Sequence, residues 1–360
     1  MPGVVFRPAC CFAFTRFRNL PSARTMTAST KPTRSGGAKK TIANVGAAIA
    51  TVLVVGVIGE VMLRVKSSDQ KSYSVEMWRY AKTLKQPDPL LGHVHIANAA
   101  ARLQNVDISI NSWGLRGPEP GPVDPTRRRV LVLGSSITLG WGVAEDKILT
   151  SLLQHRLGGG VEVLNGGIGN YTAERYVGLF KTHLRALKPD VIVVHYFLRD
   201  AEILPPASGG WLMRNSQLAL MLWQAAANVM HGRDDLTGLE DYYKAMYAAG
   251  SEGRIRMEAA LAELDTITRP AGITVVLAMM PDIHRLKPYP FGFVNEQMRD
   301  LAGRLGWAYV DLLDAFKDVP DAKALYAIPG DPHPNAAGHA MMADVLTPVL
   351  QKLGVGRAAK

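Results

Sequence analysis

The chain has 360 residues, of which 48% are hydrophobic, enough for one large domain or two small ones. Its formal net charge is +10, but residues 1–66 hold ten of the 41 lysines and arginines and only one of the 31 acids. Residues 67–360 therefore carry 31 bases and 30 acids. Because the basic excess belongs to the N-terminal tail, the charge argues against a nucleic-acid-binding protein.

The tail contains a segment that is long and apolar enough to cross a membrane. Residues 41–59 carry no charge, and the uncharged run continues to Leu63 except for Glu60. This length is close to the ~20 residues that a helix needs to span a bilayer. Eight basic residues precede the segment, which favours a cytoplasmic N-terminus. We predict one transmembrane signal anchor at 41–63, with the rest of the chain outside the cytoplasm.

The leader, residues 1–40, admits two alternatives. A cleaved signal peptide would need a small-x-small cleavage site after the apolar segment, and neither this site nor a lipobox cysteine is present. Met26 is an alternative start, because residues 26–40 already form a complete basic leader. Residues 1–25 would then not be translated.

Predicted strands alternate with predicted helices over residues 125–355. The strands are apolar throughout, as in parallel sheets that helices cover on both faces. Apolar residues at helical spacing mark helices near 177–187, 257–264 and 341–350, and Pro348 should kink the last of these. We predict a three-layer α/β/α sandwich around a five-stranded parallel sheet. The strands are expected at 130–133, 161–164, 191–197, 273–279 and 308–312.

Two segments fall outside this alternation. Residues 64–124 form an extracytoplasmic lead-in that ends in the Pro/Gly-rich "GLRGPEPGPVDP". Residues 201–250 form an insertion after the third strand, with an apolar helical pattern at 211–230. Three roles are open for this helix: a lid, a membrane-facing surface or ordinary packing.

Residues suited to nucleophilic catalysis follow the strand ends, where ligands bind in such sheets. A serine hydroxyl becomes a good nucleophile only when a base such as histidine takes its proton. The histidine needs an acceptor such as Asp331 to hold its tautomer. The negative charge that develops in the reaction needs fixed hydrogen-bond donors. Cysteine chemistry is excluded here, because Cys10 and Cys11 both precede the anchor. The strand-end segments are Gly134-Ser135-Ser136, "NGGIGNYT" at 165–172, "FLRDAE" at 197–202 and "GDPHPNAAGH" at 330–339.

These segments, in this order, resemble the blocks of the SGNH, or GDSL-type, hydrolase superfamily over residues 105–355. "GSSITLGWG" is similar to the first block, which implies that Ser136 is the nucleophile. "DPHPNAAGH" is similar to the last block, which implies that His333 is the base and Asp331 its partner. The resemblance implies a flavodoxin-like SGNH fold and no cofactor or metal.

The other two blocks depart from the family pattern. The oxyanion glycine of the second block falls at Asn170, where the donor would be a backbone amide. The asparagine of the third block falls at Arg199. Arg199 has three candidate roles: a donor to the oxyanion, a partner of Asp200 or another nearby acid, or a clamp for a substrate carboxylate. Its place at the carboxyl end of a strand favours a role that faces the site, at the oxyanion or at a substrate carboxylate.

The lead-in "ISINSWGLRGPEP" resembles that of membrane-anchored members associated with bacterial cell-surface polysaccharide. This resemblance implies a bacterial inner-membrane protein with a periplasmic esterase domain, which removes or transfers acyl (acetyl) groups on a glycan. Transfer would require a membrane partner that delivers the acyl group. The alternative function is a carbohydrate-binding or polysaccharide-assembly protein that kept the fold and lost activity, and Arg199 keeps this alternative open.

Other motifs have structural interpretations. Asn335 is expected to cap the final helix, and His195 to be packed in the core. His93 and His95 suggest a metal site, but solvated strand histidines are the expectation, because no third ligand has suitable spacing. A dinucleotide site at "VLNGGIGNY" lacks its third glycine, since Thr172 occupies that position, and no P-loop lysine follows the glycines.

Overall fold

The computed structural model describes residues 36–204, 211–231, 236–328 and 330–356. The chain divides into two compact units, residues 1–55 and residues 56–360. The second unit contains a five-stranded parallel sheet in the order β6-β5-β7-β8-β9. All five predicted strands are confirmed. They are β5 (Arg128–Gly134), β6 (Val161–Gly167), β7 (Val191–Phe197), β8 (Thr274–Met280) and β9 (Ala308–Asp311).

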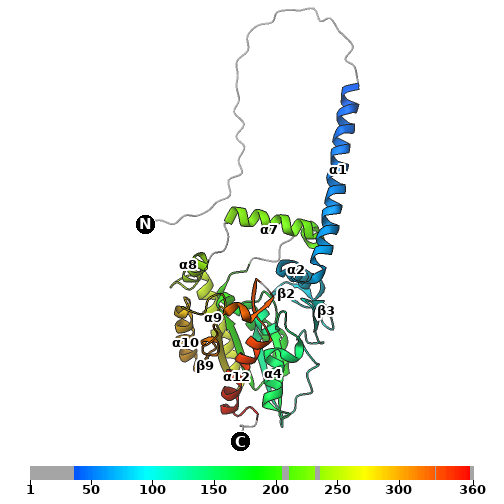
Figure 1. Cartoon of the computed structure of the whole chain (residues 1–360). Helices are drawn as coiled ribbons and strands as arrows, with labels where there is room; N and C mark the ends of the chain where they lie inside the picture. Colours follow the sequence, from blue (N-terminus) through cyan, green and yellow to red (C-terminus); the bar gives the residue numbers. More distant parts are fainter. Residues whose placement is uncertain (1–35, 205–210, 232–235, 329, 357–360) are drawn as a thin grey trace, which may run out of the picture. The chain divides into compact units, whose positions relative to one another are not determined.

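Helices cover both faces of this sheet, as the apolar strands predict (Figure 1). Alternate residues of β5 point to opposite faces: Leu131 and Leu133 belong to one buried cluster, and Val130 and Val132 to the other. The first cluster includes residues of α5 (Ala173–Leu179), α9 (Glu252–Thr268) and α10 (Gly292–Leu305). The second includes residues of α4 (Leu149–Leu157), α11 (Leu313–Phe316) and α12 (Ala336–Lys352), which continues through Pro348.

The lead-in folds onto the sheet domain within the same compact unit. It contains α2 (Tyr73–Thr83) and two antiparallel hairpins, β1 (Lys85–Asp88) with β2 (Gly92–His95), and β3 (Ala100–Leu103) with β4 (Val106–Ser109). Lead-in residues such as Tyr80 and Ile108 share a buried cluster with Leu139 and Trp141. Leu139 is the last residue of α3 (Ser136–Leu139), so the lead-in packs directly against the turn that follows β5.

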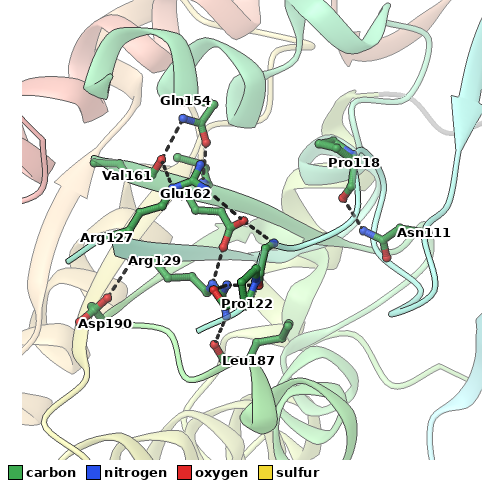
Figure 2. A network of polar contacts seen from close by, with 12 residues as sticks. Asn111, Pro118, Pro122, Arg127, Arg129, Gln154, Val161, Glu162, Leu187 and Asp190 are labelled. Carbon is green, nitrogen blue, oxygen red and sulfur yellow. Dashed lines mark hydrogen bonds and ion pairs between the residues drawn. The ribbon is translucent and has the colours of Figure 1, made fainter. Parts of the chain in front are cut away.

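A buried ion pair fastens the end of the lead-in to the sheet (Figure 2). Arg129 on β5 donates to Glu162 on β6 at 2.5 Å, and Glu162 also accepts from the Gly121 amide at 2.8 Å. The Arg129 guanidinium donates further to the carbonyls of Gly121 and Leu187. Because its charges are paired and hydrogen-bonded, this network satisfies the conditions under which buried ions are tolerated.

The insertion after β7 is helical, as its sequence pattern predicts. It contains α6 (Trp211–Asn215), α7 (Gln217–His231) and α8 (Leu236–Met246). α8 and the residue that follows it contribute Tyr243 and Tyr247 to the core. The final hairpin, β10 (Tyr326–Ile328) with β11 (Asp331–Pro334), precedes α12.

The first described helix, α1 (Gly36–Lys66), contains the predicted anchor. Among the described residues, one helical stretch is long and apolar enough to cross a membrane, Lys40–Asp69. Its apolar residues before position 56 are exposed, as expected for a helix whose partner is lipid.

Candidate active site

A tight turn at the end of β5 places Ser136 at the carboxyl edge of the sheet. β5 ends at Gly134, and Ser136 is the first residue of α3. A Cβ at Gly134 would lie 2.1 Å from Thr138 Oγ1 and 2.8 Å from the His195 carbonyl oxygen. Glycine is therefore required for the close approach that turns the chain at this point.

Ser136, His333 and Asp331 form a continuous hydrogen-bonded chain. Ser136 Oγ lies 2.7 Å from His333 Nε2, and His333 Nδ1 lies 2.5 Å from Asp331 Oδ1. Because a carboxylate only accepts, the proton between His333 and Asp331 is assigned to Nδ1, and Nε2 is left to accept from the serine hydroxyl. This is the tautomer that a histidine needs in order to act as a base toward serine.

The Asp331 carboxylate is held in place by the lead-in as well as by its own hairpin. Asp331 is 1% exposed, and its Oδ2 accepts from Gln104 Nε2 at 3.1 Å, from the turn between β3 and β4. Burial alone would raise the pKa of Asp331, but the hydrogen bonds and charge of His333, together with Gln104, outweigh it and lower the pKa. The carboxylate is therefore ionised at neutral pH.

The lead-in also places an aromatic ring beside the imidazole of His333. The ring of Tyr73, the first residue of α2, stacks on the His333 ring with centroids 5.7 Å apart and an interplanar angle of 29°. Burial raises the pKa of Tyr73, and the Asp331 charge adds to the rise. Tyr73 is therefore a neutral phenol beside the imidazole.

A second Asp-x-His pair follows β8 at the same edge of the sheet. His284 Nδ1 lies 2.5 Å from Asp282 Oδ1, and this hydrogen bond raises the pKa of His284. The His284 ring also meets Tyr326 edge-on, with centroids 6.4 Å apart. Since Tyr326 pairs with Pro334 across β10 and β11, His284 lies beside the hairpin that carries Asp331 and His333.

Asn170 has a backbone conformation that asparagine adopts more readily than most other residues. Its φ is +62°, in the left-handed region that glycine prefers and asparagine tolerates best among other residues. Asparagine is therefore suited to the conformation that this position requires. Arg175 Nη1 donates to the Asn170 carbonyl at 3.3 Å.

The preceding peptide, Gly169–Asn170, is clamped by the β1–β2 hairpin. The Gly169 carbonyl accepts from Lys85 Nζ at 2.6 Å and from His93 Nε2 at 3.0 Å, and the Gly169 amide donates to the Tyr80 hydroxyl at 3.0 Å. Burial lowers the pKa of Lys85 to about 7, and the nearby Arg175 charge lowers it further. The Gly169–Asn170 peptide is thus held at its carbonyl oxygen, and the Ile168–Gly169 peptide before it is held at its amide.

The expectation that His93 and His95 are solvated is wrong for His95, and His93 is half-buried. His95 is buried, with Nε2 2.6 Å from the Tyr80 hydroxyl and Nδ1 2.7 Å from the Gly114 carbonyl. Burial lowers the pKa of His95 to about 4, so the ring is neutral at physiological pH. His93 is half-buried because the β1–β2 hairpin folds back onto the loop after β6, where His93 Nε2 contacts the Gly169 carbonyl. Among the described residues, no group of three or more His, Cys, Asp or Glu residues is arranged to hold a metal ion.

Arg199 pairs with a neighbouring acid. It lies in a short 3₁₀ turn after β7, and its Nε and Nη2 donate to the two oxygens of Glu202 at 2.9 and 3.1 Å. Its side chain is 56% exposed. This arrangement is the second of the three roles considered for Arg199.

Two structural expectations are confirmed. His195 is buried, with Nδ1 3.0 Å from Thr138 Oγ1. Asn335 caps α12, because its side-chain oxygen accepts from the amides of Ala337 and Gly338.

One family model matches the part of the chain that contains the candidate site. The model of the GDSL-like lipase/acylhydrolase family matches residues 132–341. The chain belongs to this family. A search of the curated proteins found no match.

The solved structures that match this family member include the following three. TesA is 18% identical, covers 63% of this chain and 99% of its own, and has a TM-score of 0.41. LAE5, an alpha/beta hydrolase enzyme from the metagenome of Lake Arreo, Spain, is 19% identical. Its match covers 64% of this chain and 97% of LAE5, with a TM-score of 0.40. A catalytic mutant of Axe2, an acetylxylan esterase from Geobacillus stearothermophilus, is 18% identical. Its match covers 64% of this chain and 97% of Axe2, with a TM-score of 0.41.

Proposed function

We propose that this protein is a membrane-anchored serine esterase that uses Ser136, His333 and Asp331. The observation that carries the proposal is the unbroken Ser136–His333–Asp331 chain, with contacts of 2.7 and 2.5 Å. Membership of the GDSL-like acylhydrolase family supports ester hydrolysis as the reaction. The apolar stretch Lys40–Asp69 supports membrane attachment.

In the proposed mechanism, Ser136 Oγ attacks the ester carbonyl while His333 Nε2 takes its proton. Asp331 stabilises the imidazolium that forms. The bond from the carbonyl carbon to the leaving alcohol breaks as His333 returns the proton to the alcohol oxygen, which leaves an acyl group on Ser136. Water then attacks the acyl-enzyme with His333 again as the base, and Ser136 is regenerated.

The oxyanion donors in this mechanism are the backbone amides of Ser136 and Asn170. The Asn170 N–H belongs to the same planar peptide as the Gly169 carbonyl, and the two point in opposite directions. Lys85 and His93 hold that carbonyl, so they fix the direction of the Asn170 N–H. A positive charge on Lys85 also polarises the peptide, which makes the N–H a stronger donor.

The proposed substrate is an acyl ester, with acetyl as the first candidate, on a periplasmic cell-surface polysaccharide. The lead-in that resembles polysaccharide-associated members supports this choice. Residues 67–72 separate the end of α1 from Tyr73, a path of at most ~25 Å. The site is thus close to the inner membrane. Transfer to a sugar hydroxyl would use the same acyl-enzyme, with a membrane partner as the acyl source.

A pair of serine variants tests the proposal. The full chain in detergent should hydrolyse a small activated acetyl ester, and Ser136→Ala should lower kcat by about 10³ or more, because the nucleophile is removed. Ser135→Ala is the matched control, one residue away, and should retain activity within about tenfold. Full activity of Ser136→Ala would refute the proposed nucleophile.

A further inference from the structure

Helix α7 exposes an apolar face. Met221, Leu222, Trp223, Ala225 and Ala226 are all exposed, and Leu222 and Trp223 are 62% and 61% exposed. At 100° per residue, these five positions occupy one arc of about 200° on the helix. Soluble proteins place polar side chains on such an arc, so this surface is suited to a non-aqueous neighbour.

The polarity of α7 is inverted relative to a helix of a water-soluble domain. Gln217 is buried and Gln224 is partly buried, and both lie on the side opposite the exposed arc. Residues 217–230 contain no charged side chain. A helix with its glutamines inward and its leucine, methionine and tryptophan outward is the pattern expected where the outer solvent is lipid.

The start of α7 is fixed to the last turns of α1. The Glu60 carboxylate accepts from the amides of Gln217 and Leu218, at 3.1 and 2.9 Å, and from the Ser216 hydroxyl at 2.9 Å. Arg64 donates to the Asn215 carbonyl at 3.3 Å. α7 leads away from this point (Figure 1).

The position of Glu60 sets the depth of this junction. It is the first charged residue after the uncharged run 41–59, so it marks the level at which the candidate span reaches the polar boundary of a bilayer. Because Glu60 caps α7, the first residues of α7 are at that level. A tryptophan on the exposed arc suits the same interfacial layer.

We propose that α7 lies in the surface of the membrane that α1 crosses, with Met221, Leu222 and Trp223 in contact with lipid. The helix is ~22 Å long, and its apolar arc would sit among the lipid headgroups and upper acyl chains. The catalytic unit is then fixed to the bilayer at two places. This inference rests on insertion of α1 and does not depend on the esterase chemistry.

Site-specific fluorescent labels test this proposal in the full chain. Cys10 and Cys11 are changed to serine, and single cysteines are introduced as Leu222→Cys, Trp223→Cys, Leu90→Cys or Val52→Cys. Leu90, 79% exposed in the β1–β2 turn, is the solvent control, and Val52, 70% exposed on α1, is the insertion control. Each variant carries an environment-sensitive NBD label in phosphatidylcholine–phosphatidylglycerol vesicles that contain lipid spin-labelled in the headgroup region or, for the label at 52, at the middle of the acyl chain. A circular dichroism spectrum that matches that of the unlabelled chain reports folding.

Labels at 222 and 223 should shift to the blue and be quenched by the spin-labelled lipid at least threefold more than the label at 90. Quenching at 52 with no more quenching at 222 and 223 than at 90 would overturn the proposal. A label at 222 that shifts to the blue without quenching by lipid, together with energy transfer between labelled copies, would mean that the apolar face of α7 contacts a second copy. This outcome would also overturn the proposal. An unquenched label at 52 would remove the anchor on which the proposal depends.

Discussion

At the scale of single residues, Asp331 shows how the site is specified. It accepts three hydrogen bonds, from the ring and the amide of His333 and from Gln104. These donors keep the buried carboxylate ionised and hold the His333 ring in one tautomer. In the proposed mechanism, the reactivity of Ser136 therefore depends on a residue that does not touch the substrate.

Asp331→Asn should lower kcat by about 10³–10⁴, because an amide no longer enforces the tautomer in which Nε2 accepts. The folded-state pKa of Asp331 lies below its ordinary 3.8, so its stabilising contribution is complete above about pH 4 and is lost as the pH falls through that lowered value. The melting-temperature difference between wild type and variant should therefore be constant from about pH 5 to 8 and shrink below pH 4. A variant with kcat within about tenfold of wild type would contradict this role.

Arg199→Asn should leave kcat on a neutral ester within about twofold of wild type. Arg199 is 56% exposed and engaged with Glu202, and such surface pairs contribute about 0–1 kcal/mol. Glu202→Gln is the matched control and should behave in the same way. A loss above about tenfold in Arg199→Asn alone would place the guanidinium at the oxyanion, and a gain would show that the arginine restrains the site.

Some of these site residues can be predicted from the sequence, and others cannot. Ser136, Asp331 and His333 follow predicted strands in local motifs, so their proximity could be expected from the edge of a parallel sheet. Gln104 and Tyr73 reach the site only through folding of the lead-in, and no local pattern marks them. Asp282 and His284 repeat the Asp-x-His spacing after a predicted strand, a signal that was present in the sequence.

At the scale of elements, the central sheet was predictable and the lead-in was not. The five central strands are mainly apolar on both faces, which suits a sheet that helices cover on both sides. β1 to β4 are four residues long and have exposed polar residues, so they depend on contacts with other parts of the chain. β1 and β2 contact the loop after β6, and β3 and β4 pack in the cluster that contains Leu139 and Trp141. The surroundings of Lys85, His93 and His95 therefore appear only in the folded chain.

Lys85→Met should lower kcat by about tenfold to a hundredfold with little change in KM. The methionine cannot hold the Gly169 carbonyl, so the Asn170 N–H loses its fixed direction in the transition state. Affinity for a boronic acid transition-state analogue should fall in parallel. Lys85→Arg should restore part of the rate, and Lys82→Met, at an exposed lysine on α2, should have no effect.

An unchanged kcat in Lys85→Met, with Ser136→Ala inactive, would exclude the clamp and leave the esterase assignment intact. An unchanged melting temperature in Lys85→Met would separate loss of positioning from loss of folding.

At the scale of the whole molecule, the proposed membrane attachment rests on helices and not on net charge. Residues 67–360 are nearly neutral, so electrostatic attraction to anionic lipids would contribute little to their position. The link of residues 67–72 keeps the catalytic unit near α1, and the junction at Glu60 ties α7 to the same end of that helix. The proposed esterase thus acts on substrates at or near the membrane surface.

The most direct test of the central claim, that Ser136 is an activated nucleophile, is covalent labelling of the full chain with a fluorophosphonate probe followed by peptide mass spectrometry. The proposed mechanism predicts one adduct on Ser136, which is lost in Ser136→Ala and in His333→Ala, while Ser135→Ala is still labelled. An adduct at another residue, or an unlabelled Ser136 in a preparation that hydrolyses esters, would contradict it.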